Sequence, residues 1–278
     1  MSTSAKSSSN KTRSKSTFLQ RINISFPWLK LIAVLVIGVI AILDLLDLTI
    51  SKANESYHKV SVAPMSKHIR ITERDITNKM LVALTFDDGP SDATTPSLLD
   101  TLKNRDVPAT FFMLGYMARS NPEVVKRIKA EGHDIASHTM YHQNLIRITP
   151  AAVQADINEA NAVFQDILGH TLEYTRPPYG NINDAVRNNV GTPMILWSVD
   201  TLDWKNQNTD SIISTTMSEV SDGAIILMHD IYPTTVNAVP VLIDELRKAG
   251  YEFVTISELT KIRGYTLQNG TAYYNFRP

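Results

Sequence analysis

The chain contains no cysteine among its 278 residues. This absence excludes a disulfide-stabilised scaffold, a thiolate nucleophile and any zinc or iron–sulfur site that depends on cysteine. The chain also has no Gly-x-Ser-x-Gly elbow, no Walker A loop and no Gly-x-Gly-x-x-Gly motif, so a serine hydrolase, a nucleoside triphosphatase and an enzyme with a nucleotide cofactor are disfavoured. Neither charge sign dominates, with 27 basic and 28 acidic side chains, which argues against a nucleic-acid binder that works by bulk charge.

The charges are nevertheless unevenly distributed along the chain. The first 50 residues hold six basic and two acidic side chains, so the rest of the chain is acidic, with 21 basic and 26 acidic side chains. Residues 2–16 are rich in Ser, Thr, Lys and Asn and hold almost no large apolar side chain. Such a segment cannot bury enough apolar surface to offset its conformational entropy. We therefore expect residues 1–30 to form a disordered basic tail.

An apolar stretch follows the tail at residues 31–50, in which Asp44 and Asp47 are the only charged residues. About 20 apolar residues span a bilayer as a helix, and Trp28 lies where interfacial aromatic side chains are typically found. Because all six basic residues of this region precede the stretch, the positive-inside rule predicts a cytoplasmic N-terminus. We expect a single-pass anchor in the cell membrane, with the rest of the chain extracellular. A cleaved signal peptide and a buried core helix are the alternatives.

Short apolar runs alternate with helical patterns from residue 80 to residue 278, whereas residues 51–79 have mixed polarity and are predicted to be a linker. The runs are Leu81–Phe86, Ala109–Leu114, Asp134–Ser137, Glu173–Arg176, Met194–Val199, Ala224–Met228 and Glu252–Ile256. The predicted helices are Pro122–Glu131, Pro150–Leu168, Asp210–Val220 and Val236–Ala249. This alternation is typical of a parallel sheet covered by helices. It predicts an α/β domain, a distorted (β/α) barrel with about seven parallel strands; an open doubly wound sheet is the alternative.

Titratable or hydrogen-bonding side chains follow five of these seven runs. The segments are Asp87–Pro90, His138–His142, Arg176–Gly180, Asp200–Trp204 and His229–Asp230. In (β/α) barrels the active site lies at the C-terminal ends of the strands. The sequence therefore predicts that these five segments meet in one site.

Two of the segments carry potential metal ligands. His138 and His142 are four residues apart, so on a helical turn they would share one face and bind one metal ion. Two imidazoles and a carboxylate form a common zinc site that leaves a position for water. Asp87 and Asp88 are adjacent in a Gly-Pro turn, where one can bind the metal and the other can act as a base. A structural histidine pair and a solvated turn are the alternatives.

The remaining segments supply further groups for hydrolysis. Arg176 precedes two prolines, and a guanidinium fixed there can hold a carboxylate in a bidentate contact. His229 ends an apolar run, and either Asp203 or Asp230 can set its protonation. Together these groups provide a metal-activated water, a base and an acid, which suits hydrolysis of an amide or an ester.

Trp204 and Leu227 are core residues by default, but beside a metal they can wall a pocket for a small apolar group.

The five segments, in this order, resemble the motifs of polysaccharide deacetylases with a NodB-homology domain, carbohydrate esterase family 4. The resemblance covers residues 80–262 and shows no departure at the motif positions. The resemblance implies that Asp87 is the catalytic base and His229 the catalytic acid, and that Arg176 and Asp203 support these two groups. It implies that Asp88, His138 and His142 bind the metal. It also implies that Tyr179, Trp204 and Leu227 bind the substrate.

The resemblance implies a Zn²⁺ ion, or another divalent ion such as Co²⁺, and removal of N-acetyl groups from GlcNAc-type polysaccharides. Together with the predicted anchor, it makes the chain similar to membrane-anchored peptidoglycan N-acetylglucosamine deacetylases. The expected partners are an acetylated glycan and the membrane. Deacetylation of chitin oligomers, exopolysaccharide or acetylated xylan are alternative activities. A non-catalytic, metal-stabilised wall-binding module is the alternative from a different functional class.

Overall fold

The computed structural model describes residues 79–278 together with residues 38–39, 42–44 and 76. The chain divides into two units at residue 63. In the first unit, the five described residues are helical and exposed. Among the residues that the structure describes, no helix has the length and apolar character needed to cross a membrane.

The three predicted N-terminal segments fall largely outside the described residues. These are the tail at residues 1–30, most of the anchor at residues 31–50 and nearly all of the linker at residues 51–79. They stay predictions, and the structure bears on the second unit alone.

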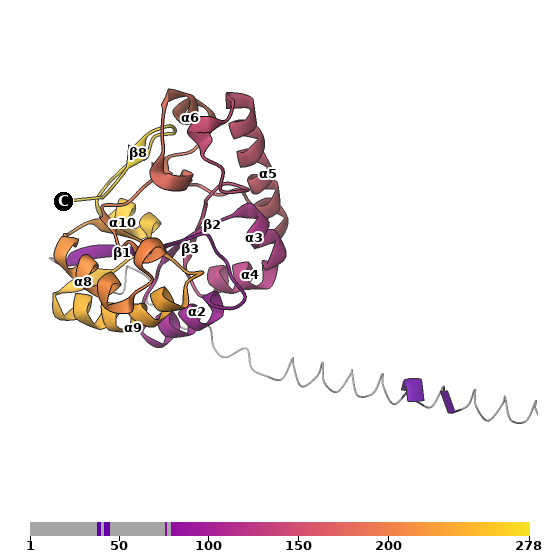
Figure 1. Cartoon of the computed structure of the whole chain (residues 1–278), viewed down its shortest axis with the longest axis horizontal. Helices are drawn as coiled ribbons and strands as arrows, with labels where there is room; N and C mark the ends of the chain where they lie inside the picture. The colour runs from indigo at the N-terminus through magenta and orange to yellow at the C-terminus, as the bar shows by residue number, and fades with distance from the viewer. Residues whose placement is uncertain (1–37, 40–41, 45–75, 77–78) are drawn as a thin grey trace, which may run out of the picture. The chain divides into compact units, whose positions relative to one another are not determined.

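A parallel sheet with β1 at its centre forms the core of the second unit (Figure 1). Its strands are β1 (Met80–Asp87), β2 (Thr110–Met113), β3 (Asp134–Ser137), β5 (Val199–Asp200), β6 (Ala224–His229) and β7 (Tyr251–Phe253). The strand order is β3-β2-β1-β6-β5, with β7 also paired to β1, and each of these pairings is parallel. β1 is buried from its second residue to its last, which explains why its sequence is a near-continuous apolar run.

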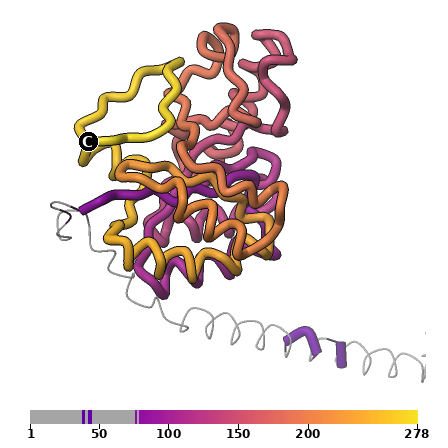
Figure 2. The backbone as a smooth tube through the Cα atoms, turned by 60° about the vertical axis from the view of Figure 1, so that its left-hand side comes forward, coloured from indigo at the N-terminus to yellow at the C-terminus, as the bar shows by residue number. Residues whose placement is uncertain are grey.

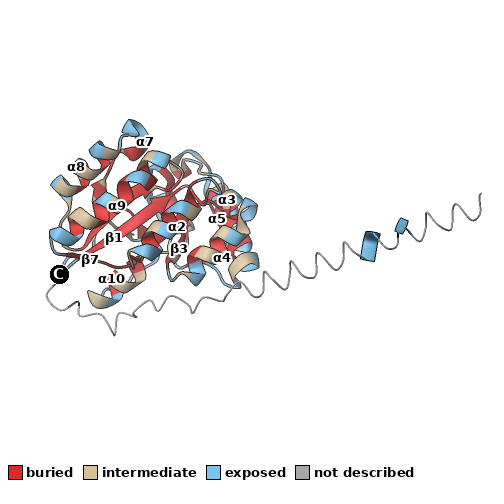
Figure 3. Cartoon of the chain, turned by 90° about the horizontal axis from the view of Figure 1, so that it is seen from below, coloured by how far each residue is buried: buried red, intermediate tan, exposed pale blue. Residues whose placement is uncertain are grey.

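Helices cover this sheet and expose their outer faces, while β1 is buried among them (Figure 3). They are α2 (Thr95–Asn104), α3 (Gly115–Ser120), α4 (Pro122–Ala130), α5 (Pro150–Leu168), α6 (Asp184–Asn189), α7 (Asp203–Asn206), α8 (Thr209–Glu219), α9 (Pro233–Lys248) and α10 (Ile256–Ile262), with the short 3₁₀ turns η2 (Leu145–Arg147) and η3 (Pro178–Gly180). α5 has the predicted bounds: the Thr149 side chain accepts a hydrogen bond from the Ala152 N–H at its start, and Gly169 ends it at φ 81°.

Two of the predicted strands differ in the structure. Glu173–Arg176 contributes only isolated bridges, from Thr175 to Ser137 and to Met194. Met194–Val199 is split, because its first residues form β4 (Met194–Ile195), whereas its end belongs to β5, which pairs with β6.

The partner of β4 is a strand that the sequence did not predict, β8 (Ala272–Tyr273). The C-terminal segment that carries β8 is the yellow part of Figure 2, and it also forms an antiparallel bridge from Asn275 to Ala224 of β6. Phe276 is fully buried. The segment thus links β4 to β6. This parallel α/β arrangement is consistent with the predicted distorted barrel.

The register of the central strands brings their last residues together. Asp87 at the end of β1 lies beside Phe112 of β2 and beside His229 of β6. Because the strands are parallel, the loops that follow them all leave at the same edge of the sheet. This edge carries the site.

Candidate active site

A pocket of about 440 Å³ opens at the C-terminal ends of the strands. Its lining residues are Asp87, Asp88, His138, His142, Tyr179, Trp197, Asp200, Trp204, Leu227, His229 and Tyr232. Eight of the ten predicted site residues are among them. The other two, Arg176 and Asp203, are fully buried and contact the base and acid candidates from behind.

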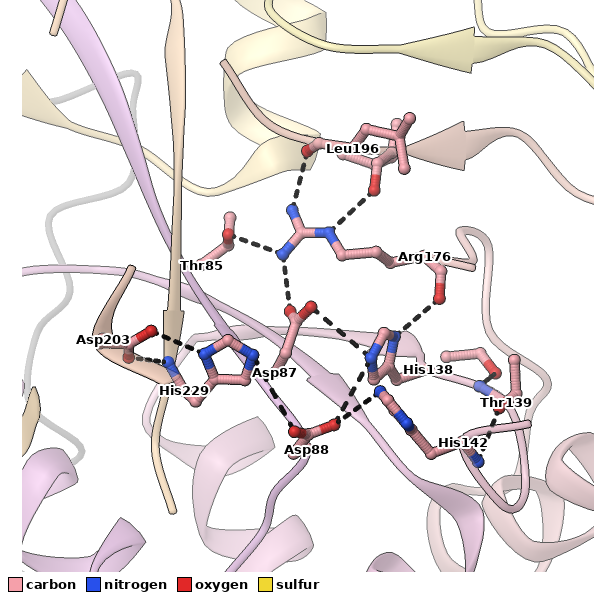
Figure 4. Close-up of polar contacts among 12 residues, drawn as sticks. Thr85, Asp87, Asp88, His138, Thr139, His142, Arg176, Leu196, Asp203 and His229 are labelled. Atoms are coloured by element: carbon pink, nitrogen blue, oxygen red, sulfur yellow. Dashed lines mark hydrogen bonds and ion pairs between the residues drawn. The ribbon is translucent and has the colours of Figure 1, made fainter. Parts of the chain in front are cut away.

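Three potential metal ligands converge in this pocket (Figure 4). Asp88 Oδ1 lies 3.5 Å from His138 Nε2 and 3.5 Å from His142 Nε2. The same Asp88 oxygen is buried and has no hydrogen-bond partner among the described residues. A buried carboxylate oxygen without a donor, facing two imidazole nitrogens, is the arrangement that a divalent cation satisfies. The donor set therefore fits a metal ion.

The His138 ring is held so that its Nε2 faces this point. Its Nδ1 lies 2.7 Å from the Arg176 carbonyl oxygen, which can only accept, so Nδ1 carries the hydrogen and Nε2 has a free lone pair. Burial lowers the pKa of His138 to about 3, although the nearby Asp88 opposes that shift. His138 is therefore a neutral imidazole, the form that binds a metal.

The turn between the two histidines is not helical, so the prediction that they share a helix face was wrong. Thr139 has φ 74° and His142 has φ 56°, both in the left-handed region. The turn is held by hydrogen bonds instead: the His142 N–H donates to Thr139 Oγ1 at 3.2 Å, and the Met140 N–H donates to Asp156 Oδ1 at 2.6 Å. Asp156 is buried on α5. The two rings meet because local hydrogen bonds stabilise an irregular turn.

Arg176 holds Asp87 through a buried ion pair. Its Nη1 donates to Asp87 Oδ1 at 2.6 Å and to Thr85 Oγ1 at 2.9 Å. Its Nε and Nη2 donate to the carbonyls of Ile195 and Leu196, both at 2.9 Å. The contact with Asp87 is therefore monodentate rather than bidentate as predicted, because Thr85 accepts the second Nη1 hydrogen and backbone carbonyls hold Nε and Nη2.

This geometry leaves Asp87 Oδ2 free to face the pocket, 3.7 Å from His138 Nε2. Burial raises the pKa of Asp87, and the charge of Arg176 opposes the increase. A carboxylate with a raised pKa accepts a proton more readily than an exposed one does. Asp87 is accordingly the candidate base of the site.

Asp203, and not Asp230, contacts His229. Its Oδ1 lies 2.8 Å from His229 Nδ1, and its Oδ2 accepts hydrogen bonds from the His229 N–H at 2.7 Å and from Thr235 Oγ1 at 2.8 Å. Burial alone would lower the pKa of His229, but the hydrogen bond and charge of Asp203, with smaller contributions from Asp87 and Asp88, raise it to about 9. These contacts favour the protonated form of His229, in which Nε2 can donate into the pocket.

Aromatic and apolar side chains form the remaining walls. Tyr179 is in the left-handed region at φ 62° and is 61% exposed, with its ring 4.7 Å from that of His142. Trp204 is 48% exposed at the start of α7, whereas Leu227 is buried on β6. The pocket therefore has one buried apolar side chain beside its polar groups and an exposed aromatic rim.

Three lining residues were not assigned to the site from the sequence: Trp197, Asp200 and Tyr232. Asp200 follows a strand in the same way as the predicted residues do, so its position was a usable signal. Trp197 lies where the chain passes from β4 to β5, and Tyr232 precedes α9, so only the three-dimensional structure places them here.

The metal site can be tested by removing one ligand. We expect His142→Ala to weaken Zn²⁺ binding by more than about 100-fold, since even residues that only orient ligands change affinity about 10- to 100-fold. The measurement is competition with a chromophoric chelator on the metal-free chain. His170→Ala, the same substitution at an exposed histidine, is the control and should bind Zn²⁺ like the parent. Equal affinity of the two variants would contradict the site.

The chain is similar to known polysaccharide deacetylases. A family model for polysaccharide deacetylases matches residues 74–192. The peptidoglycan-N-acetylglucosamine deacetylase PgdA of Listeria monocytogenes is 42% identical over 212 residues, which are 76% of this chain but 45% of the Listeria protein. The chain thus spans less than half the length of that relative.

Two further relatives are covered almost entirely. A peptidoglycan-N-acetylglucosamine deacetylase of Bacillus cereus is 38% identical over 194 residues, which are 67% of this chain and 91% of that protein. The structure of a family 4 acetyl xylan esterase from Clostridium thermocellum, in complex with a cobalt ion, has a TM-score of 0.67 and 32% identity, and the match covers 70% of this chain and 98% of the esterase chain. The chain belongs to the polysaccharide deacetylase family.

Proposed function

We propose that the chain is a metal-dependent hydrolase that removes N-acetyl groups from a GlcNAc-type polysaccharide, with cell-wall peptidoglycan as its substrate. The observation that carries the proposal is the pocket geometry. Asp87 Oδ2 and His229 Nε2 lie on neighbouring strand ends, and both face the three converging donors of Asp88, His138 and His142.

Asp88, His138 and His142 would hold a divalent ion such as Zn²⁺. When bound, such an ion polarises a carbonyl oxygen and makes a water molecule easier to deprotonate. A cobalt ion accompanies the related acetyl xylan esterase, which supports a divalent ion in this family.

Asp87 accepts the proton of the attacking water. Arg176 keeps the Asp87 carboxylate oriented, because the guanidinium is fixed by the Ile195 and Leu196 carbonyls and cannot follow a moving partner. As the water oxygen bonds to the acetyl carbon, the carbonyl oxygen gains negative charge. The backbone N–H of Tyr179 stabilises that oxygen.

His229 completes the reaction by donating its Nε2 proton to the amine nitrogen as the carbon–nitrogen bond breaks. Acetate and a free amino sugar are the products. Asp203 orients the ring and stabilises its protonated form through Nδ1. Leu227 and Trp204 provide an apolar wall for the acetyl methyl group.

Peptidoglycan is favoured among the acetylated polymers for two reasons. Two relatives are named peptidoglycan deacetylases, and the predicted membrane anchor would present the domain to the cell wall. Acetylated xylan is a second candidate, because the acetyl xylan esterase has the same fold. Asp87 Oδ2 and His229 Nε2 both face the pocket, which argues against a wall-binding module without catalytic activity.

The separate roles of the two adjacent aspartates can be tested by isosteric substitutions. We expect Asp87→Asn to keep Zn²⁺ and to lose roughly 10²–10⁴-fold in kcat, the usual contribution of a positioned general base. Asp88→Asn should lose both Zn²⁺ and activity. Metal content and acetate release are measured side by side, with melting temperatures to check folding, because Arg176 would face a neutral amide in Asp87→Asn. If Asp87→Asn lost the metal and Asp88→Asn kept it, Asp87 would be the metal ligand and Asp88 the base.

The substrate is tested by acetate release from purified peptidoglycan, chitooligosaccharides and acetylated xylan at matched acetyl concentrations. We expect the highest kcat/KM on peptidoglycan, with Asp87→Asn as the inactive control. Preference for xylan would reassign the substrate. No acetate release from any polymer by a chain that binds Zn²⁺ would favour the wall-binding module.

We further propose that the deacetylase domain faces the outside of the cell, because the six basic residues of the first 50 all precede the apolar stretch at residues 31–50. Protease added to intact cells should digest the domain and leave a cytoplasmic control protein whole. Protection of the domain until the cells are lysed would refute this topology.

A further inference from the structure

Asp230 directly follows the proposed acid His229, yet its carboxylate has no part in the reaction described above. The side chain is fully buried, and its Oδ2 accepts a hydrogen bond from Thr95 Oγ1 at 2.5 Å. Its Oδ1 has no hydrogen-bond partner among the described residues. Burial raises the pKa of Asp230 to about 7. A buried carboxyl group of this kind costs stability, so its position calls for a physical reason.

The carboxylate lies against Gly89, the residue after the metal ligand Asp88. A Cβ atom at Gly89 would collide with both carboxylate oxygens of Asp230. Gly89 is not among the glycines with positive φ, so close approach, and not backbone conformation, requires glycine there. The end of β6 and the turn that carries Asp88 are therefore in direct contact.

Thr95 joins the same two segments through its hydroxyl group. The hydroxyl donates to Asp230 and accepts from the Ser91 N–H at 2.8 Å, and the Thr95 N–H donates to the Ser91 carbonyl at 3.0 Å. Thr95 is fully buried at the start of α2. A continuous chain of hydrogen bonds thus runs from Asp230 through Thr95 to Ser91, three residues after Asp88.

We propose that Asp230 and Thr95 are positioning residues that fix the turn of Asp88 relative to the strand end of His229. Asp88 itself has φ 73°, so its carboxylate direction depends on a turn that the backbone alone does not favour. Residues that orient metal ligands from behind set the affinity of the metal site. This inference rests on the metal role in the proposed function and adds two residues that do not line the pocket.

The test removes the Thr95 hydroxyl at nearly constant volume. In the purified full chain, we expect Thr95→Val to bind Zn²⁺ about 10- to 100-fold more weakly than the parent, by chelator competition on metal-free protein. Thr95→Ser keeps the hydroxyl and should restore most of the affinity. The absorption spectrum of bound Co²⁺ should change in Thr95→Val and resemble the parent spectrum in Thr95→Ser.

Thr216→Val is the matched control. Thr216 is also a fully buried threonine, and its hydroxyl donates to the Ile212 carbonyl within α8, away from the pocket. It should lose stability in a thermal melt without a change in Zn²⁺ affinity. The proposal is overturned if Thr95→Val, like Thr216→Val, keeps the parent Zn²⁺ affinity and the parent Co²⁺ spectrum. A lower melting temperature in both variants would then show that Thr95 is merely structural.

Asp230→Leu removes the acceptor of the Thr95 hydroxyl at similar volume and provides a second route if Thr95→Val does not fold. It should weaken Zn²⁺ binding, and the double variant should bind no more weakly than the weaker-binding single variant, because both changes break one chain of hydrogen bonds. Parent affinity in a folded Asp230→Leu variant, or fully additive losses, would overturn the proposal. A parent chain that binds no Zn²⁺ would instead refute the proposed function.

Discussion

The buried ion pair between Arg176 and Asp87 is the interaction on which the rest of the site depends. Neither side chain is more than 3% exposed, and the Arg176 guanidinium also lies 3.8 Å from the centre of the Phe112 ring. Removing one partner of a buried pair typically costs about 3–5 kcal/mol, because the other charge is left without compensation. The same arginine fixes the metal site, since its carbonyl oxygen accepts from His138 Nδ1. One residue therefore sets the orientation of both a proposed base and a proposed metal ligand.

The parallel sheet makes this arrangement possible. Polar groups that follow five apolar segments meet at one edge because parallel strands end there together, and the register places Asp87 beside His229. This is why the sequence could place these segments at one edge without any knowledge of distances. Nine of the ten predicted residues follow or end an apolar run, a position that hydrophobic periodicity indicates, whereas Leu227 lies inside a run. Their individual roles came from the family resemblance.

The features that could not be predicted depend on contacts between segments distant in the sequence. The strand at residues 194–199 is split because its two ends pair with different strands, and its partner β8 is only two residues long. The His138–His142 turn is irregular and is stabilised by Asp156 on α5, a segment that follows later in the chain. Asp203 and Asp230 were both candidates for contact with His229 from their positions alone; the family resemblance favoured Asp203, and the fold shows that contact. Sequence spacing reports local periodicity, whereas these features are set by tertiary hydrogen bonds.

The reactive groups are held from behind by buried contacts, whereas the aromatic rim of the pocket is exposed. Asp87, His229 and His138 each contact a buried group of another segment: the Arg176 side chain, Asp203 and the Arg176 carbonyl, respectively. The side chains of Tyr179 and Trp204, in contrast, expose about half of their surface or more and make none of these three contacts. A reaction set by buried contacts is in keeping with relatives of one fold being named for peptidoglycan and for acetyl xylan.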